Sequence, residues 1–458
     1  MVRLFNVYYP LRVLALLVGE ALVICGSFLL ATVIIFGPDS YLILNYENGF
    51  YNIFIISCTA LLLSYYFDLY DLQRLSSNMD IYFRIFAVLG IVSFLLAGAA
   101  YLFPRLIMGK RCILLGLVIL TVALVCWRSA YSWLARQPYF RERVYILGTG
   151  DRAKQLVQSL SVRGDLGMDV VGWTGQLGTS ELTREAIGER LLALTRNHPI
   201  DRVITAVADR RGSIPVETLL QLRLQGIKID DATAMLEKTS GKIGIDGLHP
   251  SWLIFGEGFN SRAIFLLLHR LVSMAAALLL LALSLPLLPL IVAIVKLSSP
   301  GPAFYHQERV GLNGAIFTCF KFRTMRKEAE ADTGPTWAAD DDPRVTRVGR
   351  VLRWTRLDEI PQLWNVLRGE MSFVGPRPER PEFVEWLTEK IPYYQVRHIV
   401  PPGITGWAQI RYQYGNSVED AKEKLQYDLF YIKNRSIGLD LVILFETIKI
   451  CLLGRGAQ

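Results

Sequence analysis

The chain has 458 residues, of which 52% are hydrophobic, and its mean hydropathy is +0.33. This composition is too apolar for an ordinary soluble protein and indicates membrane segments. The formal net charge of +8 favours anionic headgroups and phosphorylated ligands as partners, and the sequence contains no motif for nucleic-acid recognition. The six cysteines form no CxxC pair and no zinc-type spacing, so they indicate neither a metal site nor a disulfide framework.

Four hydrophobic stretches of membrane-spanning length, about 20 residues each, open the sequence. They lie at roughly 11–36, 50–67, 82–103 and 112–132. Arg3 and Arg12 precede the first stretch and further arginines follow the fourth, so the positive-inside rule places both flanks in the cytoplasm. The loop that carries Arg105 disagrees, because its basic residues would lie outside. Glu20, an acid inside the first stretch, is either functional or part of a helix–helix contact. Residues 1–135 are thus predicted to form four transmembrane helices.

Residues 142–245 are predicted to form a Rossmann-like α/β domain. A buried strand at 144–147 precedes Gly148-Thr149-Gly150-Asp151-Arg152-Ala153, which resembles the G-x-G-x-x-A fingerprint of a dinucleotide-binding fold. Further strands are expected at 170–173 and 202–207. The acidic residue that follows the second strand in nucleotide-binding members is missing, because Gly175-Gln176 occupies that neighbourhood. A domain without a cofactor, serving dimerisation or regulation, is therefore favoured over a nucleotide binder.

An apolar run at about 264–297 follows, with basic residues on both sides and Pro286 and Pro289 near its middle. A single span would place one basic flank outside, against the charge bias. Prolines can bend a helix, so a re-entrant helix that enters one leaflet and returns satisfies both observations, provided that protein covers the freed carbonyls. A plain fifth span with tolerated prolines is the alternative.

The adjacent acids Asp358-Glu359 are the most informative feature of the C-terminal segment. Arginines recur every third residue before them, from Arg344 to Arg356, on a helix predicted over 346–367 with a break near Pro361. Adjacent helical residues point in different directions, so one acid can face a phosphorus atom while the other holds a metal. An acid pair that merely stabilises a helix N-terminus is the alternative. The surrounding guanidinium groups favour a phosphorylated substrate with a divalent metal.

Several ordered motifs accompany this pair. They are Lys321-Phe322-Arg323-Thr324-Met325, Leu357-Asp358-Glu359-Ile360-Pro361-Gln362-Leu363, Gly375-Pro376-Arg377-Pro378, Pro402-Gly403-Ile404-Thr405-Gly406, and Tyr427-Asp428 with Tyr431. With the proline-bent run, the segment from about 262 to 458 resembles the bacterial sugar transferase family. These monotopic phosphoglycosyl transferases are also called polyprenyl-phosphate hexose-1-phosphate transferases. The four hydrophobic stretches and the α/β domain resemble, by architecture, the large and often dimeric members.

The resemblance implies transfer of a sugar-1-phosphate from a UDP-sugar to undecaprenyl phosphate, with release of UMP, as the initiating step of cell-surface polysaccharide synthesis. It implies that Asp358 is the nucleophile that forms a covalent phosphosugar intermediate, and that Glu359 binds Mg²⁺. Residues for substrate phosphate or nucleotide are implied at Lys321, Arg323, Arg356 and Arg377. Pro286 matches the bend of the re-entrant helix. Many relatives carry Ser directly before this proline, where this chain has Leu285 preceded by Ser284.

The implied fold class is a mixed α and α/β membrane protein. It combines the four transmembrane helices, the Rossmann-like cytosolic domain, and a re-entrant helix with a mainly α-helical catalytic domain at 260–458. We expect a homodimer in the bacterial inner membrane, with the catalytic domain facing the cytosol. Three alternatives stay open: a membrane glycosyltransferase releasing UDP, a non-catalytic scaffold for polysaccharide assembly, and a NAD-linked oxidoreductase. His306 and His398 are acid–base candidates by type, but they are predicted to be structural because they have no visible partners.

Overall fold

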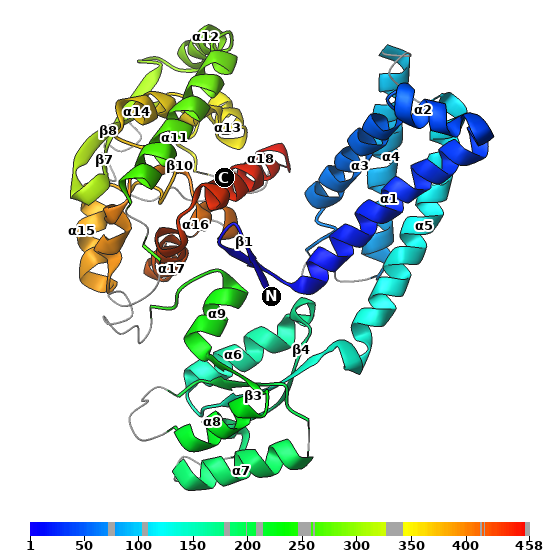
Figure 1. The fold of residues 1–458 in the computed structure, drawn as a ribbon. Helices are drawn as coiled ribbons and strands as arrows, with labels where there is room; N and C mark the ends of the chain where they lie inside the picture. Colours follow the sequence, from blue (N-terminus) through cyan, green and yellow to red (C-terminus); the bar gives the residue numbers. More distant parts are fainter. Residues whose placement is uncertain are drawn as a thin grey trace. The chain divides into compact units, whose positions relative to one another are not determined.

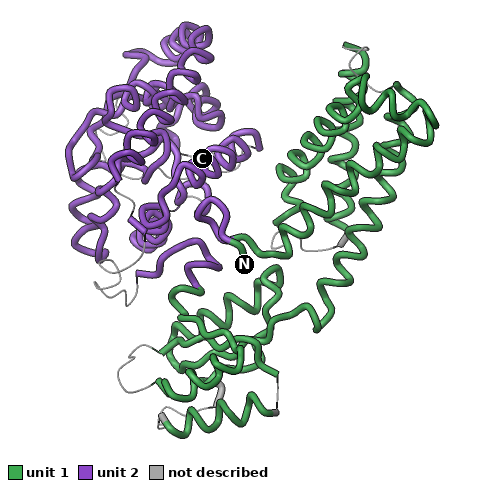
Figure 2. Tube along the Cα trace, in the orientation of Figure 1, with its two compact units in different colours: residues 1–2, 9–235 green, residues 3–8, 236–458 purple. Residues whose placement is uncertain are grey.

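The computed structural model describes residues 1–71, 78–102, 109–177, 184–197, 199–207, 214–245, 258–259, 262–326, 342–412, 415 and 417–453. The chain divides into two compact units (Figure 2). Unit 1 comprises residues 1–2 and 9–235, and unit 2 comprises residues 3–8 and 236–458. The N-terminal residues 3–8 therefore belong to the same unit as the C-terminal half of the chain. The predicted domain boundaries are finer than this division and stay predictions.

Unit 1 begins with a bundle of apolar helices (Figure 1). They are α1 (Leu11–Phe36), α2 (Ser40–Tyr46), α3 (Gly49–Tyr66), α4 (Asn78–Leu102) and α5 (Lys110–Arg136). Together with one helix of unit 2, they supply five described helical stretches that are long and apolar enough to cross a membrane. Helices α1 and α5 approach closely because Gly19 packs against Trp127 and Gly116 against Phe28. The topology of the spans stays a prediction, and Arg105 lies outside the described residues.

The bundle contains a buried ion pair. Glu20 of α1 accepts a hydrogen bond from Arg128 Nε of α5, and its second oxygen accepts one from the Tyr70 hydroxyl at 2.5 Å. Arg128 also donates to the backbone oxygen of Leu69 at 2.8 Å. Glu20 therefore takes part in a contact between helices, the second of the two roles considered from the sequence, and both of its oxygens are engaged.

The second part of unit 1 is a four-stranded parallel sheet in the order β4-β3-β5-β6. Its elements are β3 (Glu142–Leu147), α6 (Asp151–Val162), β4 (Met168–Trp173), α7 (Arg184–Asn197), β5 (Arg202–Thr205), α8 (Val216–Leu224) and β6 (Lys228–Asp231), and α9 (Ala232–Ser240) spans the boundary between the units. The three predicted strands are confirmed. A Cβ at Gly148 would lie 2.6 Å from the carbonyl oxygen of Ala206, so close strand packing by itself requires this glycine. The Rossmann-like assignment and the absence of a cofactor stay predictions.

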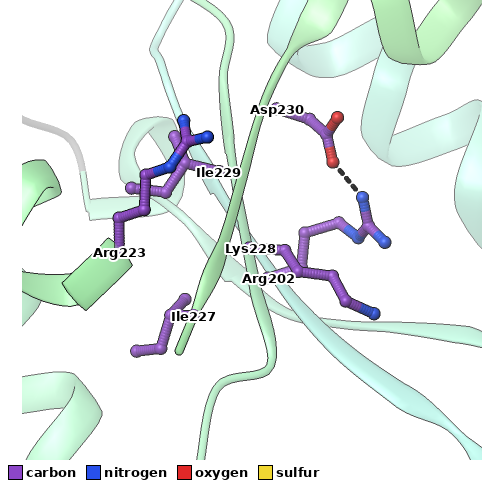
Figure 3. Close-up of a pocket in the computed structure, with 6 residues that line it drawn as sticks. All are labelled: Arg202, Arg223, Ile227, Lys228, Ile229 and Asp230. Carbon is purple, nitrogen blue, oxygen red and sulfur yellow. Dashed lines mark hydrogen bonds and ion pairs between the residues drawn. The ribbon is translucent and has the colours of Figure 1, made fainter. Parts of the chain in front are cut away.

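The edge strand β6 borders a hollow with several cations (Figure 3). Its lining residues are Arg202, Arg223, Ile227, Lys228, Ile229 and Asp230. Arg202 pairs with Asp230 and, at 3.1 Å, with Glu142 of the neighbouring strand. Lys228 reaches the same Glu142 at 2.8 Å. Acids of the sheet therefore neutralise two of these cations, and the hollow is less basic than its composition indicates.

Two helices of unit 2 occupy the run that the sequence predicts to be bent. Helix α11 (Ala263–Ser284) and helix α12 (Leu288–Ser298) are separated by residues 285–287, which include Pro286. The Ser284 hydroxyl donates to the carbonyl oxygen of Leu281 at 3.1 Å, so it bonds within its own helix. Pro289 lies in the first turn of α12, where proline is tolerated. The break lies at the predicted proline, and the re-entrant path through a membrane stays a prediction.

The rest of unit 2 surrounds the predicted acids and includes the N-terminal hairpin. Its elements are β1 (Val2–Leu4), β2 (Val7–Tyr9), β7 (Phe304–Val310), β8 (Ile316–Phe322), α13 (Arg347–Trp354), the 3₁₀ turn η6 (Leu357–Glu359), α14 (Gln362–Arg368), β9 (Ser372–Val374), α15 (Pro381–Lys390), η7 (Tyr394–Ile399), β10 (Gly403–Thr405), α16 (Trp407–Arg411), α17 (Val418–Asn434) and α18 (Ile437–Leu453). Strands β7 and β8 pair antiparallel, whereas β9 and β10 pair parallel. Trp407, Phe430 and Tyr431 are buried in the core of this region.

The helix predicted over 346–367 with a break near Pro361 is interrupted earlier than expected. Helix α13 ends at Trp354, and Arg356 adopts a left-handed φ of 58° that interrupts the helical path. The short turn η6 follows, and α14 begins only after Pro361. The acids therefore lie on a turn between two helices rather than on a helix face.

Candidate functional site

The turn η6 carries Asp358 and Glu359, and both are buried with 7% of their surface exposed. Leu357 and Ile360, which flank the two acids, pack against the apolar cluster that contains Phe322. These apolar anchors fix the turn from both sides. Two adjacent carboxylates are thereby held out of bulk water. A buried negative charge destabilises the fold unless nearby positive charges or hydrogen bonds compensate it.

Glu359 is the compensated member of the pair. Its Oε1 accepts a hydrogen bond from the Arg377 guanidinium at 2.8 Å and one from Lys321 Nζ at 3.1 Å. Burial on its own would raise the pKa of Glu359. The positive charges of Arg377, Lys321 and Arg356 outweigh burial and hold this pKa well below its usual range. Glu359 is therefore ionised at neutral pH.

Asp358 has the opposite environment. Its Oδ1 is buried and has no hydrogen-bond partner among the residues that the structure describes. Burial, together with the neighbouring negative charge of Glu359, raises the pKa of Asp358 above its ordinary value. Buried oxygens without a partner are rare in folded proteins and call for an explanation. An unpartnered carboxylate oxygen beside an ionised, cation-bound neighbour is suited to nucleophilic attack or to metal binding.

Backbone contacts hold the loop that carries Arg377. Strand β9 leads into this loop and pairs with β10, which brings Gly375 against Gly403. A Cβ on Gly403 would lie 2.1 Å from Gly375 N, and a Cβ on Gly406 would lie 2.2 Å from Gly375 O. The two glycine motifs recognised in the sequence therefore meet backbone to backbone.

A buried arginine supports the same loop from behind. Arg397 donates to the carbonyl oxygen of Arg377 at 2.9 Å and to the Tyr394 hydroxyl at 2.7 Å. Its guanidinium also lies 3.0 Å from Asp428 Oδ2, and both partners of this pair are buried. Sequence reasoning assigned no role to Arg397 or Asp428, although Asp428 belongs to a quoted motif. A buried charge pair at this place makes Arg397 a positioning residue for Arg377.

Lys321 is positioned through its own strand. Asn365 of α14 is fully buried, donates from Nδ2 to the carbonyl oxygen of Thr318 at 2.7 Å, and accepts from the Phe320 backbone amide at 3.2 Å. These bonds fasten β8 to the helix that follows the acids. Because β8 and α14 are joined in this way, the ammonium group of Lys321 on β8 lies within hydrogen-bond distance of Glu359.

The remaining predicted residues lie in different places. The terminal nitrogens of Arg323 donate to the carbonyl oxygens of Ser299 at 2.7 Å and Pro300 at 3.1 Å, beyond the end of α12. This guanidinium therefore holds the chain just after α12, and its predicted contact with substrate phosphate stays a prediction. Arg356 precedes the acids and acts on Glu359 through its charge. Pro286 lies at the helix break described above.

The two histidine candidates differ in environment. Burial, aided by the charge of Arg397, lowers the pKa of His398 to about 4, so this imidazole is neutral at physiological pH. His306 lies on β7 with its ring edge-on to Phe320 at a centroid distance of 5.1 Å. Neither histidine is bonded to Asp358 or Glu359 in the hydrogen bonds found among the described residues, and their predicted structural role stays a prediction.

The residues around the acids were also compared with the needs of a magnesium ion. No group of three or more His, Cys, Asp or Glu side chains gathers as a metal cluster among the described residues. Mg²⁺ is commonly held by one or two carboxylates, with substrate phosphates and water completing its coordination. Glu359 together with the unpartnered oxygen of Asp358 meets this requirement. The site fits a magnesium ion that binds together with a phosphorylated substrate.

The chain thus combines apolar helices with a buried acid pair beside two cations. Comparison with known proteins identifies the class to which it belongs. Residues 264–454 match the family model of the bacterial sugar transferases. A relative from Escherichia coli K12, named UDP-glucose:undecaprenyl-phosphate glucose-1-phosphate transferase, is 33% identical over 350 residues, which cover 72% of each chain. The chain therefore belongs to the bacterial sugar transferase family, and the resemblance seen in the sequence is confirmed.

Two further relatives are named for different sugars. An enzyme of Aeromonas hydrophila, named UDP-N-acetylgalactosamine-undecaprenyl-phosphate N-acetylgalactosaminephosphotransferase, is 41% identical over 52% of this chain and 56% of its own. The undecaprenyl-phosphate glucose phosphotransferase of Komagataeibacter xylinus is 37% identical over 69% of this chain and 60% of its own. The chain thus spans less than two thirds of the length of these two relatives.

Proposed function

We propose that this protein transfers a sugar-1-phosphate from a UDP-sugar to undecaprenyl phosphate and releases UMP. The observation that carries the proposal is the asymmetry of the buried acid pair. Glu359 is bound by two cations, whereas Asp358 keeps an oxygen without a partner among the described residues. Family membership and the names of the relatives support a phosphotransferase reaction with this lipid acceptor.

The proposed reaction has two in-line steps at Asp358. In the first, a carboxylate oxygen of Asp358 forms a bond to the phosphorus that bears the sugar. The bond from this phosphorus to the bridging diphosphate oxygen breaks, and UMP leaves with the electron pair. In the second, an oxygen of undecaprenyl phosphate attacks the same phosphorus. The bond to Asp358 then breaks, which restores the carboxylate and yields the lipid diphosphate-sugar.

The neighbouring residues have separate duties in this scheme. Arg377 and Lys321 keep Glu359 ionised, and their positive charges would attract the phosphate oxygens of the substrate. Glu359 would hold Mg²⁺ together with the substrate phosphates, and the bound ion would supply neutralisation of the diphosphate charge. The acids keep their distinct roles because burial raises the pKa of one while cations lower that of the other.

The membrane arrangement is part of the same proposal. We assign four transmembrane helices, a Rossmann-like cytosolic domain and a re-entrant pair α11–α12 to a homodimeric protein of the bacterial inner membrane. The apolar helices and the break at Pro286 support this assignment. A catalytic unit on the cytosolic face would meet both a soluble nucleotide sugar and a lipid phosphate at headgroup depth.

The test is a nucleotide-release assay. The purified full-length protein, Mg²⁺ and undecaprenyl phosphate are incubated with UDP-glucose, UDP-N-acetylgalactosamine and further UDP-sugars. Release of UMP together with a lipid diphosphate-sugar is the expected result. Release of UDP would replace the proposal with a glycosyltransferase, and failure to release nucleotide from any donor, with folding verified, would favour a scaffold.

A further inference from the structure

The N-terminal hairpin belongs to unit 2 although the chain enters unit 1 directly after it. Strands β1 and β2 are joined by Phe5 and Asn6, whose φ angles are 52° and 63°. Two consecutive left-handed residues define the tight hairpin turn that usually carries Asn-Gly. A phenylalanine in this conformation is strained, and such strain persists where the surroundings hold the residue in place.

Hydrogen bonds supply part of that hold. Arg3 donates to the side-chain oxygen of Asn434 at 2.9 Å, and the Asn6 amide donates to the backbone oxygen of Asn434 at 2.9 Å. Asn434 is the last residue of α17, so its carbonyl is one of those that a helix leaves without an internal partner. The hairpin therefore caps the end of α17.

Packing of side chains also holds the hairpin in place. The Phe5 ring lies against Gly438 in the first turn of α18, where an added Cβ would come within 2.4 Å of the ring. Val7 is buried with 5% of its surface exposed. The tip of the hairpin thus lies on the connection between the two helices, residues 434–438, with the Phe5 ring partly exposed at 62%. We call these five residues the elbow.

The elbow connects to the catalytic loop through buried polar groups. Arg435, inside the elbow, contacts His269 Nδ1 at 2.9 Å, and His269 Nε2 lies 3.1 Å from Asp440 of α18. The Tyr431 hydroxyl lies 2.9 Å from Asp440 Oδ1 and 3.3 Å from the carbonyl oxygen of Val374. Val374 ends β9, directly before the loop of Arg377. These contacts connect the elbow to the loop whose Arg377 bonds to Glu359.

We propose that the elbow is a docking surface for the N-terminal hairpin of the same chain, and that the docked hairpin completes the catalytic unit. The hairpin contributes the Arg3 guanidinium and the Asn6 amide, which both bond to Asn434, and the Phe5 ring, which lies against Gly438. Docking does not depend on the proposed function. Its effect on turnover does, so the two are tested separately.

Docking is tested by disulfide trapping in the full-length protein with Phe5→Cys and Gly438→Cys. The Phe5 Cβ lies 2.9 Å from a Cβ built on Gly438, which is shorter than the roughly 3.8 Å of a disulfide. Once the Phe5 ring is removed, the hairpin tip must therefore move outward by roughly 1 Å for the bond to form. Mild oxidation should link the two cysteines within one chain, as read by mass spectrometry of the joined peptides. The matched control pairs Phe5→Cys with Leu297→Cys, an 88% exposed position on α12, and should give no such link.

Two results would overturn the docking proposal. One is no link in the Phe5→Cys/Gly438→Cys protein while both thiols react with maleimide in the folded state. The other is a link formed only between two copies, which would assign the elbow to the hairpin of a second chain.

The contribution to turnover is tested with the double variant Arg3→Ala/Asn6→Ala. We expect the rate at saturating substrates to fall about tenfold or more, because the Asn6 bond is neutral and the Arg3 bond comes from a charged guanidinium. Leu4→Ala, an exposed position in the same hairpin, should keep the wild-type rate. Wild-type turnover by the double variant would overturn the link to catalysis. An inactive wild-type protein would instead count against the proposed function, and the cross-link would still decide docking.

Discussion

The protein buries acids in two regions and treats them differently. In the membrane-type bundle, one oxygen of Glu20 bonds to Arg128 and the other to Tyr70. In the catalytic unit, two acids are adjacent; the cations gather on Glu359, and Asp358 keeps a buried oxygen without a partner among the described residues. Because an uncompensated buried carboxylate destabilises a fold, the second arrangement requires a reason other than stability. Under the proposed function, the difference separates an acid that holds helices together from one that acts as the nucleophile.

The sharpest test of this comparison is Asp358→Asn. We expect turnover to fall by about 10³-fold or more, as for the loss of a covalent nucleophile, with deamidation excluded by mass spectrometry. The melting temperature should not fall, because the neutral amide removes the repulsion with Glu359. Normal turnover by this variant would exclude the covalent mechanism.

Glu20→Ala should produce the reverse pattern. Removing one partner of a buried pair leaves Arg128 uncompensated, which costs about 3–5 kcal/mol. The unfolding midpoint of the purified protein should drop, while the rate per folded molecule stays unchanged. The double variant Glu20→Met/Arg128→Met serves as the control and should recover much of the stability. An unchanged midpoint for Glu20→Ala would place this pair outside the forces that hold the bundle.

Arg397→Met tests whether positioning matters as much as contact. Loss of the bond to the Arg377 carbonyl frees the loop, and a displacement of about 1 Å in a catalytic group can cost about 10²-fold in rate. We expect kcat/KM to fall by about 10- to 100-fold. Arg411→Met removes a surface cation stacked on Trp407 and should have little effect. Equal activities of the two variants would contradict the positioning role.

The smallest predicted effect is on the pH profile. Asp358 must be ionised to attack, and its pKa is raised by burial and by Glu359, so the rate should fall on the acid side at a higher pH than for an ordinary aspartate. The positive charge of Lys321 lowers this pKa, so Lys321→Met should move the acid limb to still higher pH. Lys321→Arg keeps the charge and should leave the limb in place. A limb that moves to lower pH in Lys321→Met would refute the assignment of Asp358 as the titrating group.

Much of the fold was predictable because it depends on patterns within short stretches of the sequence. The apolar stretches predicted the long helices, short apolar runs predicted β3, β4 and β5, and Pro286 predicted the break between α11 and α12. The acid pair and its cations Lys321 and Arg377 were found through short motifs. Each of these signals lies within one element or one turn.

The features that were missed depend on chain segments that are distant in sequence. Arg397 and Asp428 pair across 31 positions, the difference between their residue numbers, and no local pattern links them. The end of α13 was misplaced because Arg356 takes a left-handed conformation that glycine or asparagine would have signalled. The contacts of Arg323 with the end of α12 depend on how β8 packs, which periodicity does not show.

The close approach of Gly375, Gly403 and Gly406 has a mechanical consequence. Where side chains meet, a contact can adjust by changing rotamers, but here the contacts join backbone atoms, so they change only when the backbone of one segment moves. The segment that carries Arg377 is therefore held rigidly, and it has little freedom to adapt to a ligand of different shape. Substitutions designed to change substrate specificity should therefore leave these three glycines in place and vary residues whose side chains can move.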